Sequence, residues 1–492
     1  MSWDAVVVGA GPNGLSASVA LAGEGLSVLL VEANDVVGGA ARTEELTLPG
    51  FRHDVGSAVY PMGAGSPFFR RLPLEEHGLE WVHPPLPLAH PMDGGDAAVL
   101  HRSVEETAAA LGAGGAGYRR LVRPFVQAWP DFAEHVMDAP FRIPRRPVLM
   151  ARFGARAALP TTVLARTLGS PEAKALLAGN AAHSAAPLER IPSAAVGLVL
   201  MIAAHAVGWP IARGGAGAIT GALSSLFLSL GGTIETGRTV TSLDELPSAR
   251  AILLALTPRQ IARLGGDRIP ARYRRRLRRW RYGPGAHKVD WALDAPIPWT
   301  SEICRRAGTV HVGGSLEEIA SAERAPWRGS ASPRPFVLVA QPSLFDPTRA
   351  PEGRHTAWAY AHVPNGWAPT PEGTMHPVTD AIERQVERFA PGFRARILAR
   401  AVHAPVELEA WDGNLVGGDV NGGAPTARQW FGPTRWTPRP WATPVPDLYA
   451  CSAATPPGGG VHGMCGYHAA MAALQGTFGV EPTAVFTRFT DR

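Results

Sequence analysis

The chain has 492 residues, 46% of them hydrophobic and 18% charged, which is the composition of a globular protein of two or three domains and excludes a disordered chain. Its formal net charge of +5 comes from an arginine-rich composition in which only Lys174 and Lys288 are lysine, and no RNA- or DNA-binding motif accompanies it, so we expect no nucleic-acid partner. The three cysteines, Cys304, Cys451 and Cys465, form no CxxC pair, which supports neither a redox dithiol nor a zinc site, and we expect no metal.

The compartment expected for this chain is the cytoplasm. A first strand that begins near the third residue leaves no room for a signal or transit peptide, and scattered cysteines suit a reducing environment. The most apolar segment, residues 194–209, is shorter than the roughly 20 residues that a spanning helix needs and contains His205. We expect a buried helix or a pocket wall there, with a shallow membrane contact as the alternative.

The N-terminal segment carries a dinucleotide-binding pattern. An apolar strand, AVVVG, leads into the turn GAGPNG, a helical pattern, and a second apolar strand that ends at Glu32. The glycines permit a tight bend and a close approach to a pyrophosphate, which lies on the helix N-terminus, and Glu32 is placed to accept hydrogen bonds from ribose hydroxyls. The alternative is a glycine-rich turn in an ordinary α/β domain. Cofactor contacts are predicted at Gly9, Gly11, Pro12, Asn13, Gly14, Glu32 and Ala33.

The next stretch, VVGGAARTEE, adds a second Gly-Gly and an Arg-Thr pair. It resembles the motif of the flavin amine oxidase and phytoene desaturase superfamily, in which the backbone and the arginine follow the pyrophosphate and ribitol of FAD. The resemblance implies that Glu32 holds the adenosine ribose of FAD. Contacts are implied at Gly38, Gly39, Ala41, Arg42 and Thr43, and the following FRHDVGS segment, with Asp54, adds Gly56 and Ser57 beneath the ring.

Two later blocks extend this resemblance. The segment 213–243 is similar to the superfamily's second FAD-binding segment, with Val240 beside the adenine, and residues 251–258 read as a buried strand. The strand LYACSA then feeds a Pro-Gly loop and a helix that starts near Gly466, which resembles the place where the chain closes over the isoalloxazine ring. Positive amide dipoles there would favour the reduced anion. The implied contacts are Gly459, Gly460, Val461 and His462.

These blocks predict the fold class and the domain organisation. We expect an α/β protein with a Rossmann-type FAD-binding domain of the glutathione reductase-like, flavin amine oxidase type, interleaved with an α+β substrate domain. The FAD-binding domain comprises residues 1–75, 213–285 and 440–492. The substrate domain comprises residues 76–212, with helical patterning, and 286–439, with the alternation of a mixed sheet.

Further blocks, at 66–91, 282–299 and 341–364, resemble the phytoene desaturase-like family, and within it the pyridine nucleotide-disulfide oxidoreductase domain 2 branch. The likeness covers nearly the whole chain. Carotenoid desaturases usually carry CGxGTHPG in the last block, whereas this chain has CSAATPPG at 451–458, so a carotenoid substrate does not follow from it.

Lys288 is the leading catalytic candidate. Its segment, GAHKVDWALDAPIPW, resembles the amine oxidase segment whose lysine holds a water against flavin N5, and the chain keeps lysine here although it otherwise uses arginine. The alternative is a surface lysine at a strand start. His462 is the second candidate, whereas His183 is interpreted as structural. Trp291, Trp299 and Trp358 are interpreted as core, and Asp54 as a cap or turn former.

The predicted function is an FAD-dependent oxidoreductase that desaturates or dehydrogenates a hydrophobic or polyketide-like small molecule by hydride transfer to flavin N5. The alternatives are a flavin amine oxidase, a redox-neutral flavin isomerase and a non-catalytic flavin-bound scaffold. The basic run at 272–283 is interpreted as a solvated helix face, with anionic lipid as the alternative. Peripheral membrane contact and a homodimer are both left open, as is covalent attachment of the flavin through Cys451, Cys465 or His462.

Overall fold

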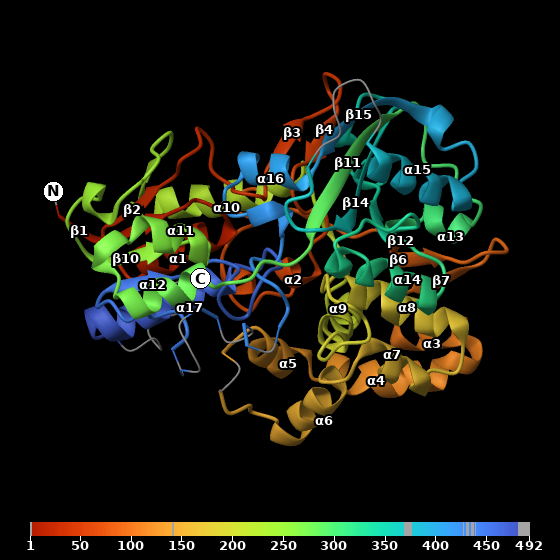
Figure 1. Ribbon diagram of the computed structural model, residues 1–492, viewed down its shortest axis with the longest axis horizontal. Helices are drawn as coiled ribbons and strands as arrows, with labels where there is room; N and C mark the ends of the chain where they lie inside the picture. The colour runs from red at the N-terminus through yellow and green to blue at the C-terminus, as the bar shows by residue number, and fades with distance from the viewer. Residues whose placement is uncertain are drawn as a thin grey trace.

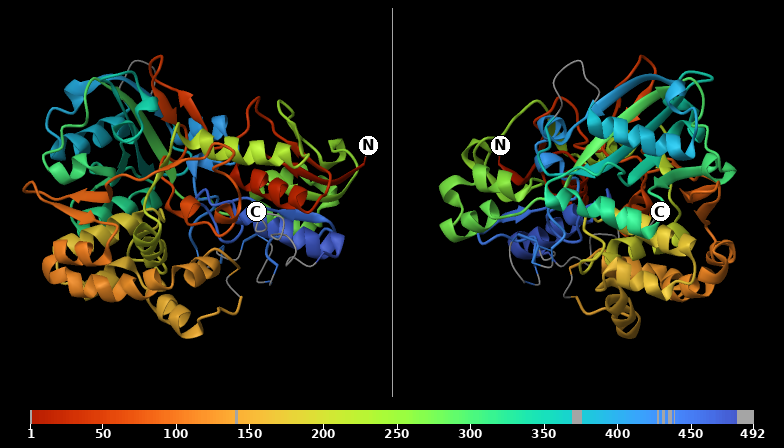
Figure 2. Two further views of the ribbon diagram at one scale, coloured as in Figure 1. Left: turned by 180° about the vertical axis from the view of Figure 1, so that it is seen from behind. Right: turned by 45° about the vertical axis from the view of Figure 1, so that its right-hand side comes forward.

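Two large β-sheets and a helical layer make up most of the described part of the molecule (Figure 1 and Figure 2). This computed structural model describes residues 2–139, 142–368, 376–426, 428–429, 432–433, 437 and 439–480. One sheet is parallel and five-stranded, the other mixed and seven-stranded, and the predicted α/β class is confirmed. The helical layer, α3 to α9, packs below the mixed sheet in the view of Figure 1.

The parallel sheet is doubly covered. Its strands, in the order β16, β10, β1, β2 and β9, are Leu448–Ala450, Ala249–Leu254, Trp3–Val8, Val28–Val31 and Thr233–Glu235. Alternate residues enter opposite cores, because successive side chains of a strand point to opposite faces. One face packs on α1 (Pro12–Gly23), α10 (Ala216–Ser229) and α17 (Met464–Ala473). The other packs on α11 (Pro258–Leu264) and α12 (Ala271–Arg278).

The mixed sheet separates a buried core from a polar face. Its strands, in the order β15, β11, β14, β13, β12, β6 and β7, are Ile397–His403, Gly285–Leu293, His355–Val363, Val337–Ala340, Ala307–Val312, Leu86–Pro91 and Ala97–Leu100. Along β11, Val289 and Trp291 join the core beneath α15 (Pro377–Phe389). Lys288 and Asp290 therefore lie on the opposite face of the same strand.

The helical layer contains the most apolar segment of the chain. α9 (Ala194–Ala206) is almost fully buried, as expected, and its His205 ring meets the Tyr118 hydroxyl at 2.6 Å. Among the described residues, no helix is long and apolar enough to cross a bilayer. Its other helices are α3 (Val104–Ala110), α4 (Gly115–Gln127), α5 (Trp129–Val136), α6 (Pro147–Ala157), α7 (Thr161–Leu164) and α8 (Pro171–Ala182).

Short elements complete the fold. They are β3 (Thr43–Glu45) paired with β4 (Arg52–Asp54), β5 (Trp81–Val82) paired with β8 (Ile211–Ala212), α2 (Pro61–Ala64), α13 (Glu302–Arg305), α14 (Leu316–Arg324) and α16 (Pro405–Trp411). Of the basic run, Tyr273 and Leu277 are buried while Arg272, Arg275 and Arg278 are exposed, which matches a solvated helix face. The parallel-sheet strands come from the segments assigned to the FAD-binding domain, and the boundaries stay a prediction.

Candidate active site

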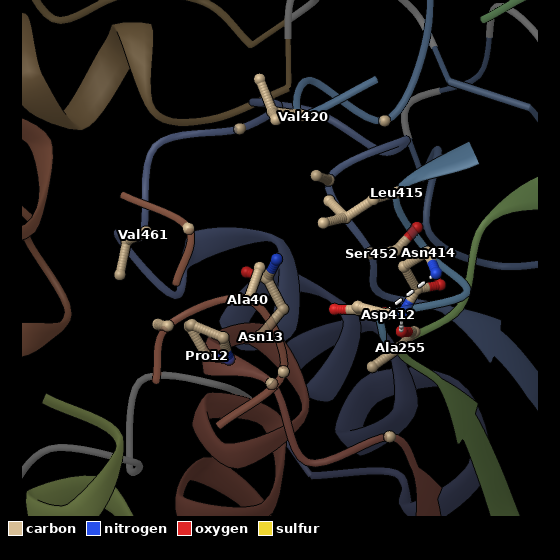
Figure 3. A pocket seen from close by; sticks show the side chains of 18 of the residues that line it. Pro12, Asn13, Ala40, Ala255, Asp412, Asn414, Leu415, Val420, Ser452 and Val461 are labelled. Carbon is tan, nitrogen blue, oxygen red and sulfur yellow. Dashed lines mark hydrogen bonds between the residues drawn. The ribbon is translucent and has the colours of Figure 1, made fainter. Parts of the chain in front are cut away.

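One cavity of about 580 Å³ is lined by segments from both ends of the chain. Figure 3 shows Pro12 and Asn13, Asp412 and Asn414, and Val461 around the same space. The predicted cofactor residues in the lining are Gly9, Gly11, Pro12, Asn13, Gly14, Glu32, Ala33, Gly39, Ala41, Gly56, Ser57, Val240, Gly459, Gly460 and Val461. Gly38, Arg42, Thr43 and His462 are outside the lining.

The N-terminus of α1 faces this cavity without a capping side chain from the described residues. The chain turns sharply there: a Cβ on Gly14 would lie 1.8 Å from the carbonyl oxygen of Gly9, and Gly9 has a φ of +98°. Both positions therefore require glycine. Gly11 differs, because a Cβ there would have only the Gly39 Cα, at 3.8 Å, within contact distance. Its missing side chain leaves room on the cavity side, and uncapped N–H groups at a helix start favour an anion.

Glu32 lies at the carboxyl end of β2 and is largely buried. Its carboxylate accepts hydrogen bonds from the amide N–H of Ala10 at 2.7 Å and from the backbone and side chain of Asn34, each at 2.9 Å. These contacts fix the carboxylate of Glu32, which lines the cavity as Val240 does. An anchored acid at this end of the cavity suits a ligand with hydroxyl groups.

Arg42 and Thr43, the residues of the Arg-Thr pair, lie outside the cavity lining and contact other side chains of the protein. The guanidinium carbon of Arg42 lies 3.9 Å from the centroid of the Trp411 ring, and its Nε lies 3.3 Å from Oε1 of Glu44. The Thr43 hydroxyl donates to Asp54 at 2.9 Å and accepts from the Gly217 amide at 3.1 Å. Arg42 and Thr43 thus have partners within the protein and lie outside the cavity lining, and their contact with a cofactor stays a prediction.

The C-terminal glycine loop contributes Gly459, Gly460 and Val461 to the cavity, and His462 lies outside its lining. Nδ1 of His462 accepts a hydrogen bond from the Met464 amide at 3.0 Å, and burial lowers the pKa of the ring to about 4. His462 is thus engaged with its own loop, and its catalytic role stays a prediction. The amide N–H of Met464, at the start of α17, donates this hydrogen bond to His462.

Lys288 enters the cavity from the centre of β11 and is 2% exposed, so it is not a surface lysine at a strand start. Its Nζ donates a hydrogen bond to Oδ2 of Asp290 and lies 5.9 Å from the centroid of the Trp358 ring. Burial lowers the pKa of Lys288 and raises the pKa of Asp290, and each group opposes the shift of the other. The proton held by this pair is therefore sensitive to what binds beside it.

A second buried ion pair flanks this lysine. Arg349 donates from Nη2 to Oδ2 of Asp54 at 2.7 Å, and the other oxygen of Asp54 accepts from the Ala216 amide at the start of α10. Asp54 therefore caps a helix that is distant in sequence. Nδ1 of His53 lies 3.5 Å from Oδ1 of Asp290, and burial lowers the pKa of His53 to about 3, so this ring is neutral.

Part of the cavity lining is apolar. Leu200, Trp209, Leu338 and Trp358 line it, together with His183. Trp291 and Trp299 are fully buried away from the cavity, as the core interpretation predicts, whereas Trp358 has a place in the lining as well as in a small core cluster.

Two features of the site were missed in the sequence. The glycine-rich run DGNLVGGDVNGG, residues 412–423, contributes Asp412, Asn414 and Asp419 to the lining, and Asn414 Oδ1 accepts from the Thr257 amide at 2.9 Å beyond the end of β10. Its glycine content was a usable signal. The second missed feature is Asp290. It lies two residues after Lys288 on the same strand, and this spacing could have indicated that the two side chains share a face.

Three groups that could tether a cofactor lie outside the lining: Cys451, Cys465 and His462. All three are buried, and Sγ of Cys465 lies 3.3 Å from the Thr455 carbonyl oxygen. Burial raises the pKa of Cys465 to about 12, and the pKa of Cys451 rises for the same reason. Protonated thiols are poor nucleophiles. The described residues also include no group of three or more His, Cys, Asp or Glu side chains arranged for a metal ion.

Known proteins resemble the chain in sequence. A model of NAD(P)-binding Rossmann-like domains matches residues 7–72. The chain is 26% identical over 550 residues to pyridine nucleotide-disulfide oxidoreductase domain-containing protein 2 of Rattus norvegicus, covering 95% of this chain and 92% of that protein. It is also 26% identical over 394 residues to phytoene dehydrogenase of Streptomyces griseus, covering 73% of each. The chain is homologous to both proteins.

Solved structures resemble it in fold. Putrescine oxidase bound to putrescine aligns over 98% of this chain and 100% of its own, with a TM-score of 0.60 and 16% identity. Reduced UDP-galactopyranose mutase aligns over 99% of this chain and 97% of its own, with a TM-score of 0.55 and 14% identity. The fold is therefore that of the flavin amine oxidases, with a Rossmann-like parallel sheet.

Proposed function

We propose that this chain is an FAD-dependent oxidoreductase that dehydrogenates or desaturates a hydrophobic or polyketide-like small molecule. One observation carries the proposal: both glycine-rich segments, from opposite ends of the chain, line the same cavity as Lys288. A nucleotide site alone would need only the first segment. Homology to phytoene dehydrogenase and to pyridine nucleotide-disulfide oxidoreductase domain-containing protein 2 supports the reaction class.

The residues of the cavity suit FAD at its two ends. The uncapped start of α1 at Gly11 would hold the pyrophosphate, and Glu32 would accept hydrogen bonds from the adenosine ribose. Gly459 and Gly460 would lie along the ring system, because glycine leaves the backbone open to a flat ligand. When bound, the flavin supplies a hydride acceptor at N5.

The protein's part in the reaction is to bind, orient and hold a proton. Lys288 keeps its Nζ at the cavity surface because Asp290 accepts its hydrogen bond from the same face of β11. Its burial among Trp358 and Leu338 excludes bulk water, which strengthens the effect of a single charge on a bound ligand. Leu200, Trp209 and Leu338 supply an apolar surface, which favours a hydrophobic substrate.

The first test is a visible absorption spectrum of the purified protein before and after acid precipitation. We expect flavin bands that pass to the supernatant, since the three potential tethering groups lie outside the lining. A colourless protein that takes up no added FAD would overturn the proposal. Anaerobic bleaching with alkyl, polyene and amine compounds then separates dehydrogenase from amine oxidase, and a flavin that no compound bleaches would favour the scaffold or the isomerase.

Lys288→Met tests the lysine directly. We expect the variant to keep its flavin but to be reduced by substrate about 100-fold more slowly, the scale of a lost proton-handling group. Lys174→Met is the matched control, because Lys174 is the other lysine of the chain and lies on α8, outside the lining. Equal reduction rates in the Lys288→Met variant and the wild type would remove this lysine from the mechanism.

A further inference from the structure

One row of side chains on the mixed sheet presents Lys288 to the cavity beside an aromatic and an aliphatic residue. Lys288 on β11 lies opposite Tyr360 on β14, and Tyr360 lies opposite Leu338 on β13. Residues paired in this way point to the same face of a sheet. All three line the cavity, and Trp358, two residues before Tyr360 on β14, lines it too. The amine of Lys288 is therefore set in a wall that is largely aromatic and aliphatic.

This amine has more N–H groups than the described part of the protein uses. Asp290 accepts a hydrogen bond from Nζ, and no second acceptor for Nζ is present among the described residues. Nδ1 of His403, which lies opposite Lys288 on the edge strand β15, has no hydrogen-bonding partner there either. The lysine is 2% exposed, so its remaining N–H groups can reach a ligand only through the cavity that it lines.

The number of spare N–H groups does not depend on which partner holds the shared proton. A charged Lys288 has three N–H groups and donates one of them to Asp290. If the proton lies on Asp290 instead, the carboxyl group donates to the nitrogen lone pair, and the neutral amine keeps two N–H groups. Two donors remain for a ligand in both cases.

The charges around this amine already balance. Asp290 compensates Lys288, and Asp54 is paired with Arg349 at 2.7 Å. His53, which lies 3.5 Å from Asp290, is neutral because burial lowers its pKa to about 3. A ligand carboxylate would therefore add an unbalanced charge to a buried site. A ligand ammonium would add a positive charge and has no acceptor to offer, whereas a neutral acceptor avoids both costs.

We propose that Lys288 is a specificity-determining residue that donates a hydrogen bond to a neutral carbonyl oxygen of an otherwise apolar substrate. The inference rests on the proposed function and narrows its substrate class to carbonyl compounds such as ketones and esters. A ligand that fills the cavity displaces water from the lysine N–H groups, so it must accept from them or leave them unpaired, which is costly in a buried site. Polyene hydrocarbons and alkylammonium ions offer no such acceptor and are therefore disfavoured.

The vibration of a bound carbonyl group reports this hydrogen bond without turnover. The probe is 2-octanone labelled with ¹³C at the carbonyl carbon, followed by isotope-edited infrared difference spectroscopy of the oxidised holoprotein. We expect the C=O stretch to lie below its frequency in hexane in the wild type and to return towards the hexane value in Lys288→Met. Lys288→Arg keeps N–H donors and should keep part of the shift. A stretch at the same frequency in the wild type and Lys288→Met would overturn the proposal.

Binding of a matched pair of ligands is the second test. In 2-methyl-1-octene a CH₂ group replaces the oxygen of 2-octanone and the shape is kept. We expect the ratio of the alkene to the ketone dissociation constant to fall about tenfold from the wild type to Lys288→Met, by flavin absorption and tryptophan fluorescence. Lys174→Met, outside the lining, should leave the ratio unchanged. An unchanged ratio in Lys288→Met, or tighter binding of octylammonium than of 2-octanone in the wild type, contradicts the proposal.

A folding defect and a missing flavin can both be told apart from a wrong proposal. If Lys288→Met does not fold, the double variant Lys288→Met, Asp290→Asn takes its place, because it leaves no unpaired charge behind. A protein without flavin fails the proposed function instead. The carbonyl stretch still reports on the ketone in that case, and so does tryptophan fluorescence, because the Trp358 ring centroid lies 5.9 Å from Nζ of Lys288.

Discussion

Lys288 and Asp290 lie two residues apart on one face of β11, and the lysine Nζ donates a hydrogen bond to the aspartate Oδ2 in the protein interior. Both side chains are almost fully buried. A buried pair of this kind is costly to break on one side only, because the remaining charge loses both its partner and its water. The pair therefore links the stability of the protein to the site that contains the lysine.

Removing the lysine alone should destabilise the protein in a pH-dependent way. Burial raises the pKa of Asp290 to about 6 even beside Lys288, and Lys288→Met would raise it further. The folded variant then holds a proton that the unfolded chain releases, so its stability is greatest at low pH and falls as the pH rises from about 4 to the raised pKa of Asp290, which lies above 6. We expect Lys288→Met to cost about 3–5 kcal/mol at pH 8 and clearly less at pH 5.5, measured by denaturant unfolding.

The double variant Lys288→Met, Asp290→Asn is the control for this effect. With no charge left to desolvate, it should be more stable at pH 8 than Lys288→Met alone. A cost that is the same at both pH values, or additive losses in the double variant, would show that the two groups are not coupled.

Gly11→Ala should separate cofactor binding from folding. The nearest atom to its new methyl group is 3.8 Å away, and the φ of −72° is open to alanine, so the fold should tolerate it. The methyl group would enter the space at the start of α1, and we expect FAD affinity to fall more than tenfold, by fluorescence titration of the apoprotein. Gly221→Ala, with nothing within 4 Å, is the matched control. Unchanged FAD affinity in Gly11→Ala would place the pyrophosphate elsewhere.

His462 should act through the loop that it holds. His462→Leu removes the acceptor for the Met464 amide and should cost about 1 kcal/mol, the usual value of a helix cap, while His462→Asn should recover most of it. Thermal unfolding of the two variants measures the difference. The pH profile of substrate oxidation should be the same in wild type and His462→Asn, and the loss of one limb of that profile would show that His462 takes part in catalysis.

The three cysteine thiols should not react with a thiol reagent in the native protein. All are buried, and burial raises the pKa of Cys304 to about 12, as it does for Cys465. We expect no reaction with Ellman's reagent at pH 8 until a denaturant is added, and then release of three equivalents. Prompt reaction of one thiol in the native protein would contradict the burial seen here.

The sequence predicted those parts of the site that depend on local patterns. The turn at Gly9–Gly14 and the strand that ends at Glu32 could be placed because a run of apolar β-branched residues, glycines and an acid follow each other within one βαβ unit. Lys288 could be selected because it stands out in an arginine-rich chain and in a recognisable segment. These features need no knowledge of distant contacts.

The remaining features arise from contacts between distant segments. The carboxylate of Asp54 meets Arg349, and the ring of His183 meets that of His311, across separations that leave no periodic pattern in the sequence. For His462 the residue pattern indicated a position but not a set of contacts. Its place in a glycine loop suggested chemistry, and the structure shows that its Nδ1 accepts a hydrogen bond from the Met464 amide. Side-chain direction in a loop is decided by packing, which a residue pattern does not encode.

The position of the second glycine-rich segment also bears on how the protein matures in the cell. Gly9–Gly14 and Gly459–Val461 both line the cavity, so the ribosome must translate as far as Val461 before the pocket can form. Strand β16 and helix α17 join the parallel sheet last, on its edge and against α1. Nascent chains and products truncated before this segment should fail to retain the cofactor. Bound flavin would therefore mark chains whose synthesis has passed Val461.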